Sequence, residues 1–150
     1  GAHDYCSQEM VNLLVVGRAV AHVFDGTRDL EGLSLTGIHK QSEVGLLSLF
    51  EHYKSMEVGD RLKRPVVPVW VVCSESHFSV LFSQDQGRVR EVSQRGGSMD
   101  LWYYDELAKQ DAPIRLTVTW DREAEALAVA EHAQDLTPPL EHCLRTRWPA

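Results

Sequence analysis

One segment organises this chain: VWVVCSESHFSVLF, which runs from Val69 to Phe82. Its first five residues are apolar on both sides of an extended backbone, which predicts a strand covered on both faces. After a short polar interruption, the residues from His77 onward alternate between apolar and polar, as on a second strand with one apolar face. A histidine at the first position of that strand lies where a general base can reach a nucleophile on a neighbouring element. The alternative is a hairpin whose turn merely contains a structural histidine.

Size and composition describe an ordinary globular chain. Its 150 residues are 43% hydrophobic and 25% charged, values that predict a single domain with a core of usual proportions. The formal net charge of -7 disfavours a nucleic-acid partner, because phosphate binding requires clustered Lys and Arg. No apolar run approaches the roughly 18 residues of a membrane span and none resembles a signal peptide, so we expect no membrane association.

The cysteines are odd in number and widely spaced, since they are Cys6, Cys73 and Cys143. This usage favours reduced thiols and an intracellular location, cytoplasmic or nuclear, over a disulfide framework. Cys73 is close to His77 in sequence, but a two-residue turn pairs Ser74 with His77 and leaves Cys73 on the opposite face. Only a three-residue turn sets Cys73 across from His77, so we interpret Cys73 as a small core residue.

A metal site is the other chemical candidate. Cys73, His77, His142 and Cys143 have side chains of the types that bind zinc, but their spacing matches no zinc motif. On the strand predicted at the end of the chain, the adjacent His142 and Cys143 point to opposite faces. We therefore predict no metal and no other cofactor.

The remaining pattern predicts an α+β architecture, with leading helices followed by a mostly antiparallel sheet. Ser7 is the expected cap of a helix that reaches about Phe24, and Ser42 is the expected cap of a second helix through Tyr53. The polar, glycine-containing stretch of residues 84–98 is expected to form a loop. The other expected elements are a short strand over residues 33–38, strands over 100–104, 114–120 and 140–148, and a helix over 121–133.

Several runs of residues occur in an order that resembles one known family. They are Val11-Asn12-Leu13-Leu14 with Gly17-Arg18-Ala19-Val20, the run GLLSLFEHY from Gly45 to Tyr53, the segment from Pro68 to Phe82, Tyr103-Tyr104-Asp105, Pro138-Pro139-Leu140-Glu141 and Arg145-Thr146-Arg147-Trp148. Together these runs resemble the MINDY family of deubiquitinases, and the similarity is greatest to the branch that contains its third and fourth members. The resemblance covers nearly the whole chain except about residues 88–98 and 121–135.

The resemblance implies a papain-like cysteine protease-type domain. The family are thiol proteases, or ubiquitin carboxyl-terminal hydrolases, that cleave isopeptide bonds in the polyubiquitin chains that mark proteins for the proteasome. On this chain the histidine of the family motif is His77, which is expected to deprotonate a cysteine thiol and later protonate the departing lysine amine. Ubiquitin or polyubiquitin is the implied partner.

One family feature has no counterpart here. The family nucleophile lies at the start of a helix well upstream of the histidine, after a Gln that contributes to the oxyanion hole, and nothing in this chain matches it. Cys6 does begin an expected helix, but its surroundings match a later helix of the family domain, so we interpret it as structural. Residues 1–150 are accordingly expected to be the C-terminal portion of a single catalytic domain and inactive alone. The alternative is a ubiquitin-binding or scaffold member without catalytic activity.

A third group often orients the imidazole of such a cysteine and histidine pair. Asp100, on the strand expected beside the histidine strand, is one candidate for this role. Ser93 and Tyr104 are the other candidates.

Overall fold

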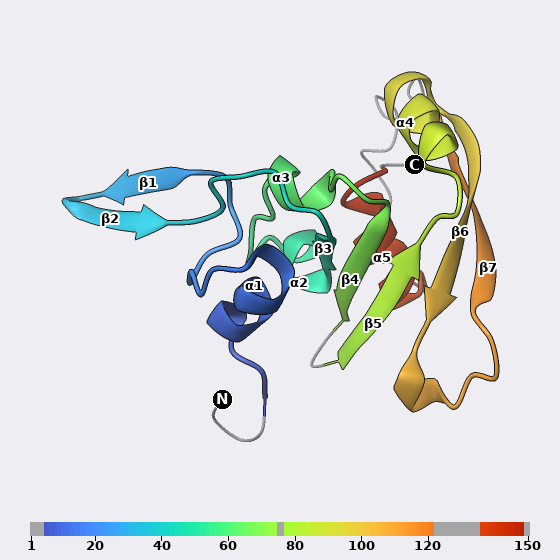
Figure 1. Cartoon of the computed structure of the whole chain (residues 1–150), viewed down its shortest axis with the longest axis horizontal. Helices are drawn as coiled ribbons and strands as arrows, with labels where there is room; N and C mark the ends of the chain where they lie inside the picture. The colour runs from blue at the N-terminus through green and yellow to red at the C-terminus, as the bar shows by residue number, and fades with distance from the viewer. Residues whose placement is uncertain (1–4, 75–76, 122–135, 149–150) are drawn as a thin grey trace.

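A five-stranded sheet is the frame of the molecule. The computed structural model describes residues 5–74, 77–121 and 136–148. The first two neighbours of the sheet are parallel and the others antiparallel, so the fold is mixed and compatible with the predicted α+β class (Figure 1). In spatial order the strands are β3 (Gly45–Ser48), β4 (Val69–Ser74), β5 (His77–Phe82), β6 (Gly97–Tyr104) and β7 (Ile114–Trp120).

The pairing of β4 with β5 fixes which side chains share a face. Ser74 pairs with His77 and Cys73 with Phe78, as the sequence predicts for strands separated by two residues. Successive side chains of a strand point to opposite faces, so Cys73 and His77 lie on opposite sides of the sheet. The strands over residues 100–104 and 114–120 are confirmed as β6 and β7.

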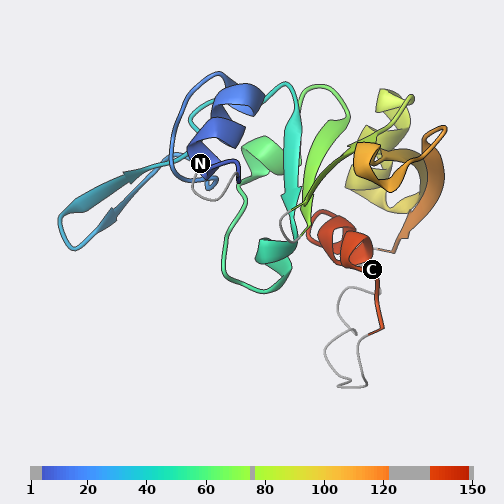
Figure 2. The ribbon, with the colours of Figure 1, turned by 90° about the horizontal axis from the view of Figure 1, so that it is seen from below.

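Two helices cover one face of the sheet (Figure 2). They are α4 (Gln86–Arg95) and α5 (Pro139–Arg145). We call this side the covered face and define it by Trp70, Val72 and Leu81, none of which is more than 1% exposed. Trp148, just after α5, meets Trp70 edge to face, with ring centroids 5.4 Å apart. The largest hydrophobic core of the described residues therefore lies between the sheet and these helices.

A second, smaller core lies at the other end of the sheet. It joins Val11, Val23, Ile38 and Leu46 to Val58 and Leu62. Its buried residues come from α1 (Gln8–Val16), β3, α3 (Asp60–Lys63) and the loops between them. The strands β1 (Thr27–Leu30) and β2 (Leu33–Thr36) and the helix α2 (Leu49–His52) contribute none of them. The antiparallel pair β1–β2 projects away from the body as a hairpin (Figure 1). Within the described ranges, no helix has the length and apolar character of a membrane span.

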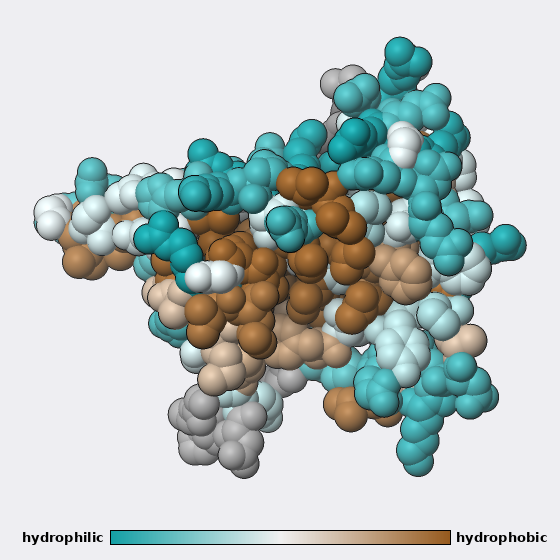
Figure 3. Space-filling model, in the orientation of Figure 1, coloured by the Kyte–Doolittle hydropathy of each residue, from teal (hydrophilic) through white to brown (hydrophobic). Residues whose placement is uncertain are grey.

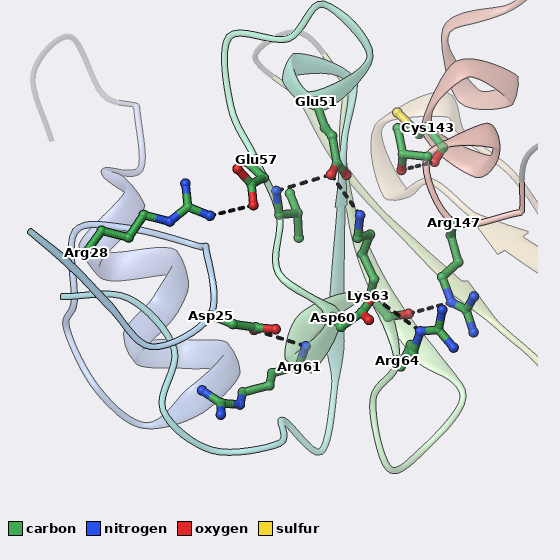
Figure 4. Close-up of polar contacts among 12 residues, drawn as sticks. Asp25, Arg28, Glu51, Glu57, Asp60, Arg61, Lys63, Arg64, Cys143 and Arg147 are labelled. Carbon is green, nitrogen blue, oxygen red and sulfur yellow. Dashed lines mark hydrogen bonds and ion pairs between the residues drawn. The ribbon is translucent and has the colours of Figure 1, made fainter. Parts of the chain in front are cut away.

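Polar contacts fasten α3 to three other parts of the chain (Figure 4). The Nζ of Lys63 lies 2.9 Å from Oε1 of Glu51 in a largely buried ion pair. The backbone N–H of Arg61 donates to Asp25 at 3.2 Å, and Nε of Arg147 donates to the carbonyl oxygen of Lys63 at 2.9 Å. These bonds connect the segment before the central strand to two earlier parts of the chain and to Arg147, near the end of the described residues.

The loop predicted over residues 84–98 is wrong, because α4 forms there. Asp85 caps this helix by accepting a hydrogen bond from the N–H of Arg88 at 2.8 Å. Val89 and Val92, three residues apart, are buried against the sheet. Two apolar residues at helical spacing therefore hold an otherwise polar helix in place.

The strand predicted over residues 140–148 is also wrong, because the chain forms α5. Pro139 is in the first turn of this helix, where its fixed φ is compatible with helical structure and its missing N–H has no cost. His142 and Cys143 consequently lie on a helix that packs against the sheet, and both are buried.

The two leading helices are shorter than the sequence predicts. Helix α1 ends at Val16 because Gly17, with φ 72°, caps it in a left-handed conformation. The helix predicted from Ser42 to Tyr53 is replaced by strand β3 and the single turn α2. At Gly45 a Cβ atom would lie 2.3 Å from Cδ1 of Trp70, so only glycine fits where β3 meets β4. The helix predicted over residues 121–133 falls almost entirely outside the described residues.

Candidate active site

His77 lies at the end of the sheet where β5 begins and β6 finishes (Figure 1). Its Nε2 is 2.7 Å from Oδ2 of Asp105, the residue that follows β6. The imidazole is 34% exposed and the carboxylate 13%. The approach is close but off the in-line geometry of a hydrogen bond, and it becomes an ion pair only when the imidazole is protonated. The pair is held by the framework of the sheet and still open to solvent on the histidine side.

The chain around Asp105 holds its carboxylate in place. Oδ1 accepts a hydrogen bond from the N–H of Leu107 at 3.0 Å and so caps a short 3₁₀ helix, η2 (Glu106–Ala108). The N–H of Asp105 itself donates to Oε1 of Gln110 at 3.0 Å. Burial opposes ionisation of this carboxyl, but the contact with His77 and the Leu107 N–H outweigh it, so the pKa of Asp105 is lowered. Asp105 is therefore an anion at neutral pH.

The contact with Asp105 assigns different roles to the two nitrogens of His77. Because Nε2 faces an anion, the proton of the neutral ring is stabilised on Nε2. Nδ1 then keeps its lone pair and can accept a proton from another group. A partly exposed imidazole with one nitrogen held by a carboxylate has the arrangement of a general base.

The structure does not bring Asp100 to His77. Asp100 pairs with Thr117 of β7 and accepts a hydrogen bond from its hydroxyl at 2.8 Å. It lies one residue out of phase with Leu101 and Tyr103, whose side chains share the face of His77, so it points to the opposite side. The carboxylate beside the histidine is that of Asp105, which was expected only as part of the family motif Tyr103-Tyr104-Asp105.

The other two candidates for orienting the imidazole are engaged elsewhere. The hydroxyl of Ser93, on α4, accepts hydrogen bonds from Arg147 at 2.9 Å and from the indole of Trp148 at 3.3 Å. The phenol of Tyr104 donates to the carboxylate of Glu106. Both residues stabilise their own surroundings, and Asp105 alone of the residues considered makes the contact.

Comparison with known proteins assigns the chain to a family. A family profile described as "Deubiquitinating enzyme MINDY-3/4, conserved domain" matches residues 1–150. The chain is 50% identical over 154 residues to the probable ubiquitin carboxyl-terminal hydrolase MINDY-4 of Mus musculus, and 47% identical over 153 residues to that of Xenopus tropicalis. The ubiquitin carboxyl-terminal hydrolase MINDY-3 of Homo sapiens is 46% identical over 87 residues, which is 58% of this chain. The chain belongs to the MINDY family, in the branch of MINDY-3 and MINDY-4.

The MINDY-4 alignments cover 99% of this chain but only 20% of each of these two relatives. The chain thus spans about a fifth of the length of the relatives it matches. The human MINDY-3 alignment likewise covers 20% of that protein. No solved structure matches the chain.

The three cysteines of this MINDY chain are not in disulfides, and two of them are far from being thiolates. Burial raises the pKa of the Cys73 thiol, an effect that a hydrogen bond with Ser48 partly offsets. Burial and the neighbouring Cys73 raise the pKa of Cys143 to about 12, and its Sγ lies 3.9 Å from the carbonyl oxygen of Cys73. A reactive cysteine requires a lowered pKa, so Cys73 and Cys143 have the properties of core residues.

Cys6 is exposed and precedes α1, which Ser7 caps.

The four residues considered for a zinc site, Cys73, His77, His142 and Cys143, do not form one. His142 stacks on His52 with ring centroids 3.8 Å apart, while His77 is paired with Asp105 at the end of the sheet. Among the residues that the structure describes, no three His, Cys, Asp or Glu side chains converge on a point where a metal could bind.

Proposed function

We propose that the protein containing residues 1–150 is a cysteine-type deubiquitinase that cleaves isopeptide bonds in proteasome-targeting polyubiquitin chains. In this proposal residues 1–150 form the C-terminal portion of a single papain-like MINDY catalytic domain, with His77 as its general base. The contact between His77 and Asp105 is the observation that carries the proposal. The names of the MINDY-3 and MINDY-4 relatives support the reaction class. An intracellular location, cytoplasmic or nuclear, belongs to the same proposal, since three widely spaced cysteines favour reduced thiols over a disulfide framework.

The mechanism follows from the two nitrogens of the imidazole. Nδ1 of His77 takes the proton of a cysteine thiol, and the carboxylate of Asp105 stabilises the resulting imidazolium through Nε2. The thiolate attacks the carbonyl carbon of the isopeptide bond. As the C–N bond breaks, the imidazolium returns its proton to the lysine amine, which leaves. Water, deprotonated by Nδ1, then hydrolyses the thioester and regenerates the thiol.

The nucleophile of this scheme comes from outside residues 1–150. Cys73 lies on the face opposite His77, Cys143 has a pKa of about 12, and the surroundings of Cys6 resemble a later helix of the family domain, so none of the three fits the role. We therefore expect residues 1–150 alone to cleave no ubiquitin chain, whereas the full-length protein cleaves them. Release of ubiquitin from tetra-ubiquitin of the proteasome-targeting linkage, followed on gels, measures this difference.

The first test replaces the base in the full-length protein. We expect His77→Ala to lower kcat by at least about a hundredfold, because general acid–base catalysis contributes on the order of 10² to 10⁴ in rate. Asp100→Asn is the matched control, since it alters a carboxylate on a neighbouring strand that does not contact His77. Wild-type turnover by the His77→Ala protein would show that the base lies elsewhere.

The second test concerns the role of Asp105. In Asp105→Asn the amide still fills the space but no longer stabilises an imidazolium, so we expect kcat to fall by about a hundredfold or more with KM little changed. Asp105→Glu, which keeps the charge, should restore part of the rate. If Asn and Glu give equal rates, Asp105 supports the local fold and does not orient the base.

A non-catalytic ubiquitin-binding or scaffold protein is the second candidate. It is favoured by the raised pKa values of the thiols in the described core. A ubiquitin bearing a C-terminal alkyne, which forms a covalent bond with a catalytic cysteine, separates the two functions. Covalent labelling of the full-length protein supports the enzyme, while binding of tetra-ubiquitin without labelling supports the scaffold.

A further inference from the structure

The side of the sheet opposite α4 and α5 has an unusual composition. We call it the open face. It consists of the outward side chains of the two central strands, which are Val69, Val71, Cys73, Phe78, Val80 and Phe82. None of these six side chains is charged. Phe78 and Val80 are each 39% exposed, although Leu81, between Val80 and Phe82 on the same strand, is fully buried.

The apolar surface continues from the open face onto α1. On that helix Met10, Leu13 and Leu14 are exposed, Leu14 to 78%. Hydrophobic residues gather over α1, β4 and β5 in one region of the molecular surface (Figure 3). Scattered exposed apolar residues are normal, but a contiguous region over two central strands and a helix indicates a surface that something else covers.

The strand order explains why this surface is unusual. β5 is the third of five strands, so it is central in the sheet and does not lie at an edge. A central strand that is apolar on both sides requires a layer on each side. Helices α4 and α5 supply one layer, and α1 with the smaller core covers only the β3 and β4 side of the other. The layer over β5 is missing from the described residues.

We infer that the open face is covered by the polypeptide that precedes residue 1 in the full-length protein. The relatives are about five times as long as this chain, so a long segment is available to supply the missing layer. The chain enters the described structure beside the open face through α1, while α5 and the last described residues lie on the covered face (Figures 1 and 2). The preceding polypeptide is therefore the nearer of the two flanking segments.

The chemistry of the open face also favours an intramolecular layer. Interfaces with transient partners are about as polar as the rest of a protein surface, whereas six uncharged side chains on the same face of two paired strands have the composition of a domain interior. Phe78 follows His77 directly, so a segment packed on Phe78 also passes the end of the sheet where the imidazole lies. The inference does not depend on the proposed chemistry, because it concerns packing alone.

The inference is tested by site-specific crosslinking in the full-length protein. Phe78 is replaced by the photoreactive analogue p-benzoylphenylalanine, the protein is irradiated, and the crosslinked peptides are identified by mass spectrometry. We expect an intramolecular crosslink to a peptide that precedes residue 1. The same analogue at Leu30, which is 57% exposed at the end of β1 in the projecting hairpin, is the control and should give no such product.

Three results would overturn the inference: a crosslink of doubled mass, which means that a second copy covers the face; a crosslink to added tetra-ubiquitin; or no crosslink at all.

Thiol protection provides a second measurement if the bulky analogue disturbs folding. Maleimide should modify Val80→Cys about tenfold or more slowly than Leu30→Cys in the full-length protein, because the covering layer must first open. Equal rates would contradict the inference. Both readouts can be repeated on the His77→Ala background, so they remain informative if the protein proves to have no catalytic activity.

Discussion

The covered face and the open face belong to the same two strands, yet their side chains differ greatly in solvent exposure. Trp70, Val72 and Leu81 pack under α4, α5 and Trp148 and are almost completely inaccessible. Phe78 and Val80, their neighbours along the chain, remain substantially accessible. Side chains that alternate along a strand experience whatever layer lies on their own side. Hydrophobicity in the sequence therefore indicates a need for cover on both sides, and only the structure shows which layer is present.

The position of His77 connects this comparison with the proposed mechanism, in which His77 is the general base. Its imidazole extends from the covered face but at the edge of the cover, where Asp105 holds Nε2 and a third of the side chain stays accessible. A base buried deeper among Leu81 and Trp70 would have no access to substrate. A base on the open face would depend on the missing layer for its orientation. The described residues thus orient the imidazole by themselves, before any nucleophile is added.

The largest effect that separates the two faces is on folding stability. Leu81→Ala should lower the free energy of unfolding of residues 1–150 by about 2–5 kcal/mol, because it removes a fully buried side chain from a packed core. Val80→Ala should lower it by less than about 1 kcal/mol, because that side chain is already partly in water. Urea denaturation followed by tryptophan fluorescence measures both. Similar losses for the two variants would mean that the open face is packed in solution.

Thiol reactivity sharpens the comparison, because each face has one cysteine nearby. Cys143 belongs to the core of the covered face, and with a pKa of about 12 instead of 9.0 it has roughly a thousandfold less thiolate at pH 8. Iodoacetamide should therefore modify native residues 1–150 first at exposed Cys6, then at half-buried Cys73 and last at Cys143. Peptide mass spectrometry over a time course gives the order. Modification of Cys143 before Cys73 would contradict the assignment of the faces.

The smallest effect is the acid dependence contributed by Asp105. Its pKa in the folded protein is below the ordinary value of 3.8, so the unfolded chain binds the proton more readily. The stabilisation is fully present above about pH 4 and is lost as the pH falls through the lower folded value. We expect Asp105→Asn to be less stable than the wild type at pH 7 and the difference to shrink toward pH 3. Denaturation at the two pH values tests this, and a constant difference would exclude the linkage.

The sequence predicts the central hairpin well because alternation and register are local properties. The run from Val69 to Phe82 predicts both strands, the pairing of Ser74 with His77 and the turning of Cys73 to the other side, and all three are observed. The family resemblance of the same run is confirmed by the comparisons. Strand formation and pairing in this hairpin depend mostly on residues that are close in sequence, so the local pattern was sufficient to predict them.

The sequence fails where an element depends on distant partners. Helix α4 has only Val89 and Val92 as buried apolar residues, and these two are buried only because the sheet packs against them. The strand at Gly45 depends on the approach of Trp70, which is 25 residues away. The strand predicted over residues 140–148 is an error of another kind, because Pro139 and the spacing of Leu140, Cys143 and Leu144 are local signals of a helix that the prediction did not use.

The carboxylate beside His77 could not be chosen from the sequence alone. Asp100 and Asp105 are both near the expected strand, and their distances from the imidazole depend on the register of β5 with β6. The signal that separates them is the capping role of Asp105, whose side chain accepts from the N–H of Leu107 two residues on. An aspartate that immediately follows a strand and begins a turn is held by its own backbone, whereas Asp100 is bonded to Thr117 across the strands.

The bonds that Arg147 and Trp148 make have a consequence for biosynthesis. Both donate to the hydroxyl of Ser93, and Arg147 shares the carbonyl of Lys63 with the indole of Trp70. The ribosome makes Trp148 55 residues after Ser93, a delay of roughly 3–11 s at about 5–20 residues per second. Throughout that interval the covered face of the nascent hairpin lacks the indole that packs on Trp70 and the two donors that bond to Ser93. The covered face can therefore be completed only after Trp148 has been added, although the strands and α4 that it packs with are made much earlier.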